Sequence, residues 1–159
     1  SGLRLLAKAL PELRRNPGNR EARLHSQIGA WQAIVPLVGG VPMGASHAIG
    51  HALGAFGISH GETSCVMAAA VQRWNAQRPC PAQRRVAEAF GEAGRPLDQI
   101  LDVFVRGLGL PASLADIDIV EDQYARLAEL TLADIWGGTN VRPLAGPEDV
   151  VAILRQAAT

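Results

Sequence analysis

The sequence predicts an all-α domain of seven or eight helices, and three observations support this. Apolar residues recur at the spacing of one helix face, as at Leu3, Leu6, Leu10 and Leu13. Clusters of proline, glycine and asparagine separate such segments. Strand patterns of alternating apolar and polar residues are absent, and the stretch Ile117 to Val120 is too short to decide. All 159 residues are expected to form a single domain.

The first two helices are expected on either side of a turn at residues 16–19, which read Asn-Pro-Gly-Asn. The first spans Ser1 to Arg15, with a kink or a boundary at Pro11, because proline lacks a backbone donor. The second is capped by Asn19 and runs to about Leu37. Its later part is expected to be buried through the apolar residues Ile28, Trp31, Ile34 and Val35.

Two central helices are expected next, after a break at residues 39–44. The third spans about Ala45 to Phe56, and the fourth, nearly all apolar, spans about Glu62 to Asn75. No Asp, Glu, Lys or Arg occurs from Leu24 to Gly61, which predicts burial of this part of the chain. The remaining helices are expected after a loop at residues 75–81, over residues 82–93, 97–107, 118–135 and 147–158.

Composition excludes several classes of protein. The formal net charge is zero, so a general nucleic-acid-binding surface, which needs basic excess, is not expected. The uncharged stretch Ile28 to Ala45 is broken by two prolines and a glycine pair, which argues against a membrane span. Cys65 and Cys80 are too few for a secreted disulfide framework and are expected to be structural or inert. With no signal-peptide pattern at the start, we expect a cytoplasmic protein.

Three of the four histidines fall in the segment GASHAIGHALGAFGISHGETSC, at His47, His51 and His60. Positions 47 and 51 are four apart, so on a helix they share one face. His60 precedes the next expected helix, and the glycines between can turn the chain back toward the pair. Imidazole is the commonest metal ligand, but single histidines often serve as core residues. The helical metalloprotease motif is excluded, because Ala48 stands where it needs glutamate.

This segment resembles the metal-binding segment of the iron-containing alcohol dehydrogenase family, which includes maleylacetate reductases, lactaldehyde reductases and glycerol dehydrogenases. The likeness extends through the VQRWN segment to the tail GGTNVRPLAGPEDVVAIL, where Val141 departs from the proline that the family often has. It covers nearly the whole chain, in register with the helical C-terminal half of that family. The matching residues of the segment are His47, Gly50, His51, Leu53, Gly54, His60 and Gly61.

The resemblance implies a role for each histidine of the segment. His47 matches the third metal ligand of the family and His60 the fourth, for Fe²⁺ or Zn²⁺, between which neutral imidazoles do not choose. His51 matches a second histidine that lies beside the nicotinamide and takes part in proton relay, so it is both the catalytic and the cofactor-binding candidate. The reaction implied is hydride transfer between NAD or NADP and an alcohol or carbonyl substrate, with maleylacetate as one possibility.

The resemblance also implies a missing partner. In the family a dinucleotide-binding half precedes this half, and a helix just upstream supplies the other two metal ligands, an Asp and a His. No glycine-rich phosphate-binding turn occurs in this chain. We therefore expect an isolated C-terminal domain that is inactive alone, exposes apolar surface where the other half docks, and belongs to a homo-oligomer.

A second hypothesis comes from a different class of protein. The chain could be a non-catalytic helical module that binds a partner through its apolar surface. Its histidines would then be core residues paired with backbone carbonyls, and metal analysis distinguishes the two hypotheses.

Overall fold

The structure, a computed structural model, describes residues 1–78 and 80–159. Within these residues the chain forms eight α-helices, short 3₁₀ turns and no strand, which confirms the predicted all-α fold. The α-helices are α1 (Gly2–Arg15), α2 (Arg20–Val38), α3 (Ala45–Gly54), α4 (His60–Asn75), α5 (Pro81–Ala89), α6 (Leu97–Gly107), α7 (Tyr124–Ala133) and α8 (Pro147–Gln156). The 3₁₀ turns are η1 (Ala115–Ile117), η2 (Glu121–Gln123) and η3 (Gly137–Thr139).

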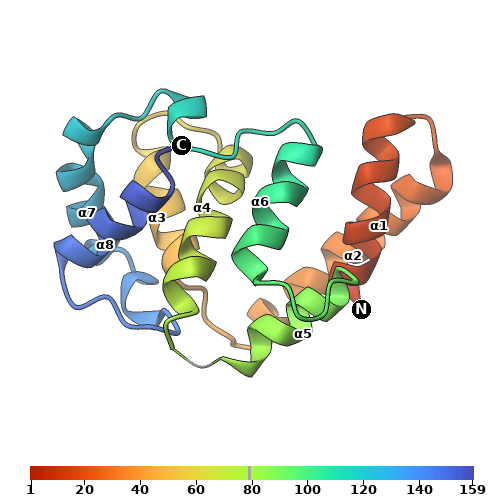
Figure 1. Ribbon diagram of the computed structural model, residues 1–159, viewed down its shortest axis with the longest axis horizontal. Coiled ribbons are helices and arrows are strands. Elements are labelled where there is room, and N and C mark those ends of the chain that lie inside the picture. Colours follow the sequence, from red (N-terminus) through yellow and green to blue (C-terminus); the bar gives the residue numbers. More distant parts are fainter. Residues whose placement is uncertain (79) are drawn as a thin grey trace.

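The helices form a core body with a hairpin at one end. The hairpin of α1 and α2 lies at the far side of α6 from α7 and α8 (Figure 1). Helix α4 runs through the middle of the body and packs against α3, α6 and α8. The main apolar cluster lies between α3, α4, α7 and α8; its fully buried side chains include Ile49, Leu53, Met67, Leu127 and Ile153. The third and fourth helices are therefore central, as expected.

The start of α2 agrees with the prediction, whereas the helix boundary that was one of two alternatives at Pro11 does not occur. The side chain of Asn19 accepts a hydrogen bond from the backbone N–H of Ala22, which caps α2 as predicted and contributes about 1 kcal/mol. Helix α1 continues through Pro11 to Arg15, so no boundary occurs there. Packing along α2 favours the helical path despite the backbone hydrogen bond that proline cannot make.

The predicted burial of the later part of α2 is wrong. Ile28, Trp31, Ile34 and Val35 are exposed, with 70% of Trp31 open to solvent. The reason is that α2 packs against α1 through its opposite side, where Ala22 and Gly29 are buried. The charge-free part of α2 thus forms an apolar surface that no other part of these 159 residues covers.

Several predicted boundaries shift. Helix α3 ends at Gly54 instead of Phe56, and α5 ends at Ala89 instead of Ala93. The single helix expected over residues 118–135 is replaced by η2 and the shorter α7. The loop expected from Asn75 to Pro81 includes Pro79, which lies outside the described residues. None of the helices described has both the length and the hydrophobicity that crossing a membrane requires.

Candidate functional site

Three imidazole rings converge where α3 meets the start of α4. His47 and His51 lie one turn apart on α3, with ring centroids separated by 4.4 Å. The ring of His60, the first residue of α4, lies 5.1 Å from that of His47 and 6.1 Å from that of His51. The sequence prediction that His60 faces the helical pair agrees with this geometry.

Glycines allow α3 and α4 to approach closely beside this cluster. Gly57 adopts a φ of +86° in the connection, a conformation that side chains other than glycine rarely adopt. A Cβ atom on Gly50 would lie 3.1 Å from Oγ1 of the fully buried Thr63. That hydroxyl donates to the carbonyl of His60, so the contact between the helices also fixes the backbone of a site residue.

The start of α3 is held by a side chain from the far end of the sequence. The buried Asn140 accepts a hydrogen bond from the N–H of Ala45 through Oδ1, at 3.1 Å. Its amide nitrogen donates to Oδ1 of Asn75, the last residue of α4, and to the carbonyl of Arg142. A single amide therefore joins the start of α3 to the end of α4 and holds the helix that carries two of the histidines.

His47 is the least exposed of the three histidines: it is partly buried, whereas His51 and His60 are exposed. Burial lowers the pKa of its imidazole below the usual value, and the neighbouring His51 and His60 lower it further. The carboxylate of Asp134 acts in the opposite direction without reversing the shift. A lowered pKa keeps the ring neutral at pH 7, which is the form that binds a metal.

His51 has a carboxylate partner that the sequence reading missed. Its Nδ1 lies 2.8 Å from Oδ2 of Asp134, which directly follows α7 and is 83 residues away in the chain. Burial acts to raise the pKa of the Asp134 carboxyl, but the backbone N–H of Trp136 and the His51 ring outweigh it, so this pKa is lowered. An ionised Asp134 accepts the proton on Nδ1 and leaves Nε2 of His51 as the free nitrogen.

The spacing of His47 and His60 fits a shared metal ion. Two imidazoles bound to one tetrahedral ion at about 2.0–2.1 Å would place their ring centroids about 5 Å apart. The observed separation of 5.1 Å meets this requirement. Among the described residues, however, no group of three or more His, Cys, Asp or Glu side chains could hold a metal ion. Within the described residues, His47 and His60 therefore form a pair at this spacing without a third such side chain beside them.

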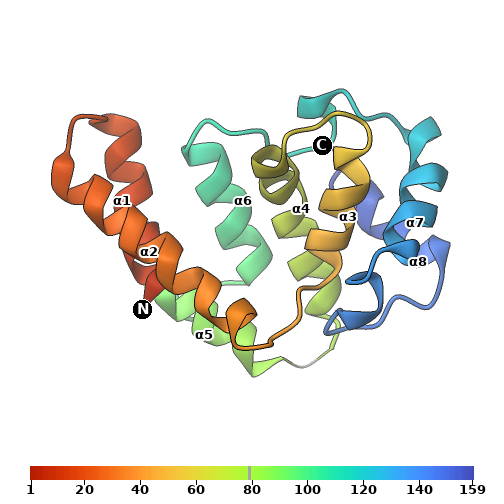
Figure 2. The ribbon, with the colours of Figure 1, turned by 180° about the vertical axis from the view of Figure 1, so that it is seen from behind.

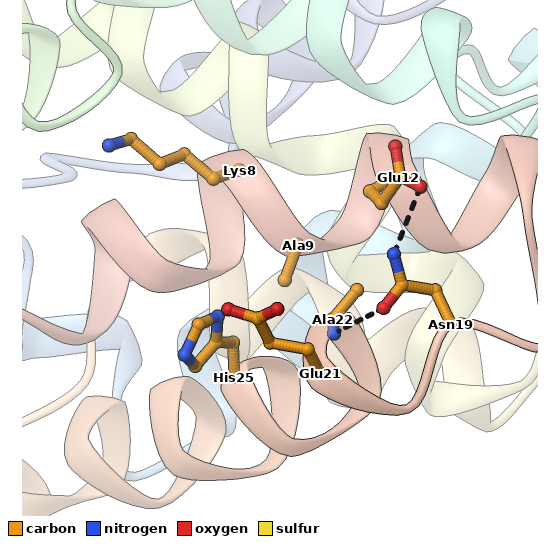
Figure 3. Close-up of a pocket in the computed structure, with 7 residues that line it drawn as sticks. All are labelled: Lys8, Ala9, Glu12, Asn19, Glu21, Ala22 and His25. Atoms are coloured by element: carbon orange, nitrogen blue, oxygen red, sulfur yellow. Dashed lines mark hydrogen bonds between the residues drawn. The ribbon is translucent and has the colours of Figure 1, made fainter.

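The fourth histidine lies elsewhere. His25 belongs to α2 and lines a separate pocket of about 190 Å³ between α1 and α2. Figure 3 shows it beside Glu21, with Glu12 and Asn19 hydrogen-bonded further along the same pocket. His25 is therefore a histidine of this chain that lies outside the site, and the three histidines of the site can be compared with it.

Both cysteines are free, and Cys65 does not have the character of a reactive thiol. Burial and the charge of Glu62 raise the pKa of the half-buried Cys65, so it remains protonated at neutral pH. This agrees with the structural role expected for it.

The sequence matches the model of the Fe-containing alcohol dehydrogenase family, C-terminal, over residues 1–158. It is 35% identical to Dehydrogenase ALT3 of Alternaria alternata, over 96% of this chain and 44% of that protein. It is 31% identical to Maleylacetate reductase 1 of Cupriavidus pinatubonensis, over 90% of this chain and 39% of that protein. The chain thus spans less than half the length of these relatives.

Solved structures agree with the sequence matches. An iron-containing alcohol dehydrogenase from Corynebacterium glutamicum superposes with a TM-score of 0.85 and 28% identity, over 99% of this chain and 43% of that one. A maleylacetate reductase from Agrobacterium tumefaciens gives a TM-score of 0.84 and 28% identity, over 99% and 43% of the two chains. The helical fold is therefore the one found in part of each of these longer proteins.

Proposed function

The chain belongs to the Fe-containing alcohol dehydrogenase family, and on that premise we propose that it is the metal-binding half of an NAD(P)-dependent oxidoreductase. The enzyme would interconvert an alcohol and a carbonyl compound. The observation that carries this proposal is the convergence of His47, His51 and His60 within centroid distances of 4.4–6.1 Å. Residues 1–159 would form the helical domain, and a dinucleotide-binding domain would precede them in the complete enzyme.

His47 and His60 would hold the metal ion. Their centroid separation fits a shared ion, and the lowered pKa of His47 keeps its nitrogen free to bind. When bound, Fe²⁺ or Zn²⁺ supplies a Lewis acid that polarises the substrate oxygen. The remaining ligands and the nucleotide site would come from the preceding domain, which agrees with the relatives being more than twice as long as this chain.

His51 would carry the proton of the reaction and lie against the nicotinamide. With Asp134 accepting the proton on Nδ1, Nε2 can take the proton that leaves an alcohol during oxidation, or return it during reduction. The His51 side chain is 43% exposed, so it can pass the proton on to solvent. Asp134 acts as a positioning residue, because it fixes which nitrogen of His51 faces the reaction.

Maleylacetate is the first substrate to test. Several relatives at 30–33% identity are maleylacetate reductases, each matched over 84–99% of this chain. The assay follows oxidation of NADH and NADPH with maleylacetate, and with short aldehydes for comparison, by the longest polypeptide that the gene encodes.

Turnover that requires His51 supports the proposed function. If replacing each of the three histidines by alanine leaves turnover and metal content unchanged, the protein would instead be the non-catalytic helical module.

A further inference from the structure

A small cavity opens where the start of α3 meets the end of α4. It has a volume of about 190 Å³, and its lining includes Ser46 of α3, Gln72 and Asn75 of α4, and Thr139 of η3. Figure 2 shows why these ends meet: α3 and α4 lie side by side and run in opposite directions. The described residues that line the cavity include no Asp, Glu, Lys or Arg.

The side chain of Asn75 has a free donor at this cavity. Asn75 is only 5% exposed, and its Oδ1 accepts a hydrogen bond from Nδ2 of Asn140 at 2.8 Å. Its own Nδ2 makes no hydrogen bond to a described residue, yet it is not one of the unpaired side-chain atoms that protein atoms enclose completely. Because the rest of Asn75 is buried, the cavity is the space to which Nδ2 is open. This donor is therefore available to a bound molecule.

Further donors around the cavity have no partner in the part of the chain that the structure describes. They are the backbone N–H and the hydroxyl of Ser46, and Nε2 of Gln72. The neighbouring N–H of Ala45 is already bound to Oδ1 of Asn140, and Oε1 of Gln72 already accepts a hydrogen bond from Gln83. Free donors thus reach the cavity from two helices.

The electrostatic surroundings favour a negative charge in this cavity. The first turn of α3 contains no Asp or Glu, so no carboxylate there offsets the positive end of the helix dipole. Nη1 of Arg78 donates to the carbonyl of Val141, a lining residue, at 3.3 Å. Arg78 forms no ion pair with a carboxylate of the described residues. A cation without a partner therefore lies at the rim.

These donors suit an anion better than they suit water. A water molecule needs acceptors for its own hydrogens as well as donors, whereas an oxyanion presents only acceptors. Backbone N–H groups at the start of a helix are a recurrent binding site for phosphate. Donors that come from two helices suit the four oxygens of a phosphate better than the two of a carboxylate.

We propose that this cavity binds a small oxyanion of the phosphate type. The N–H and hydroxyl of Ser46 and the amides of Gln72 and Asn75 would donate to its oxygens, with Arg78 as a countercharge at the rim. The anion would join the start of α3 to the end of α4, next to the link that Asn140 already makes. The inference does not rest on the proposed function, because none of these groups belongs to the three histidines of the site.

Isothermal titration calorimetry of the longest polypeptide that the gene encodes tests the proposal. The ligand is inorganic phosphate, and chloride keeps the ionic strength constant. Ser46→Asp should weaken phosphate binding at least about tenfold, because its carboxylate repels the anion and accepts from the free donors. An acidic residue in the first turn stabilises a helix, so this variant should keep its helical circular dichroism. Gln72→Glu, which keeps the shape of the side chain, should weaken binding by a similar factor.

Ala82→Asp is the matched control. Ala82 is exposed and is the second residue of α5, as Ser46 is of α3, and neither helix has an acidic residue in its first turn. This variant should bind phosphate as the wild type does. His60→Ala should also bind phosphate as the wild type does, which separates this cavity from phosphate held by a metal ion at the histidines.

A second titration, with glycerol 3-phosphate, distinguishes a free anion from the phosphate group of a larger molecule. Tighter binding of either one supports the proposal, provided that Ser46→Asp or Gln72→Glu weakens it. The proposal is overturned if the wild type binds neither compound, or if both variants are folded and bind as the wild type does. It is also overturned if His60→Ala abolishes binding, because the anion would then lie at the histidines. Turnover does not enter this measurement, so its failure leaves the proposed function to its own test.

Discussion

Nδ1 of His51 lies 2.8 Å from Oδ2 of Asp134, although 83 residues separate them in the chain. The other oxygen of this carboxylate accepts the backbone N–H of Trp136, also at 2.8 Å. The carboxylate is thus fixed on both sides, and it in turn fixes the ring of His51. Under the proposed function, this pair distinguishes the task of His51, which is proton transfer, from the metal binding proposed for His47 and His60.

Replacing Asp134 by alanine should lower turnover about 10- to 100-fold in the complete enzyme and leave metal content unchanged. The ring of His51 would lose its orienting acceptor, whereas His47 and His60 would keep their positions. Asp134→Asn should have a smaller effect, because its amide oxygen can still accept the proton on Nδ1. Steady-state kinetics and elemental analysis measure the two quantities.

Glu129→Ala is the control for this prediction, because that exposed residue lies on α7, which Asp134 directly follows, and its side chain forms an ion pair with Arg126. It should leave both quantities at the wild-type level. Equal turnover for Asp134→Ala and the wild type would show that Asp134 does not position His51 for the reaction.

Replacing Asn140 by alanine should destabilise the fold by about 2–3 kcal/mol. The change leaves the N–H of Ala45 and the side chain of Asn75 without their partner in a buried place. Urea denaturation followed by circular dichroism measures the loss. Val141→Ala, at the neighbouring exposed residue, should cost far less. A loss of the same size in both variants would show that the amide is not what joins α3 to α4.

The stability supplied by Asp116 should depend on pH. Hydrogen bonds from the N–H of Ala112 and with Ser113 lower the pKa of its carboxyl in the folded chain. A lowered folded pKa means that the stabilisation is present above the unfolded pKa of about 4 and is lost as the pH falls through the folded value. The difference in urea midpoint between the wild type and Asp116→Ala should therefore shrink below about pH 4. A difference that stays constant from neutral to acidic pH would contradict this assignment.

Local sequence patterns were sufficient to predict that His47, His51 and His60 lie close together. The spacing of His47 and His51 requires only that the segment be helical, and His60 was found because a helix start is readable from its first turn. Asp134 could not be found in this way. It directly follows α7 and precedes the Gly137–Gly138 pair, and nothing in its neighbours indicates a contact 83 residues away. Only the packing of α7 against α3 brings it to His51.

The wrong prediction that the later part of α2 is buried shows a different limit of sequence-based prediction. Apolar residues at Ile28, Trp31 and Val35 predict a covered face, yet this face is open in the 159-residue chain. A hydrophobic pattern predicts that a surface is covered, but it does not identify the segment that covers it.

The most direct test of the central claim is the metal content of four single alanine variants of the longest polypeptide that the gene encodes, purified from iron-supplemented cells. The account predicts that His47→Ala and His60→Ala lower bound metal at least about tenfold, because each removes a ligand. His51→Ala and the remote His25→Ala should keep wild-type metal, and of these two only His51→Ala should lose turnover. Wild-type metal content in both His47→Ala and His60→Ala would contradict the account.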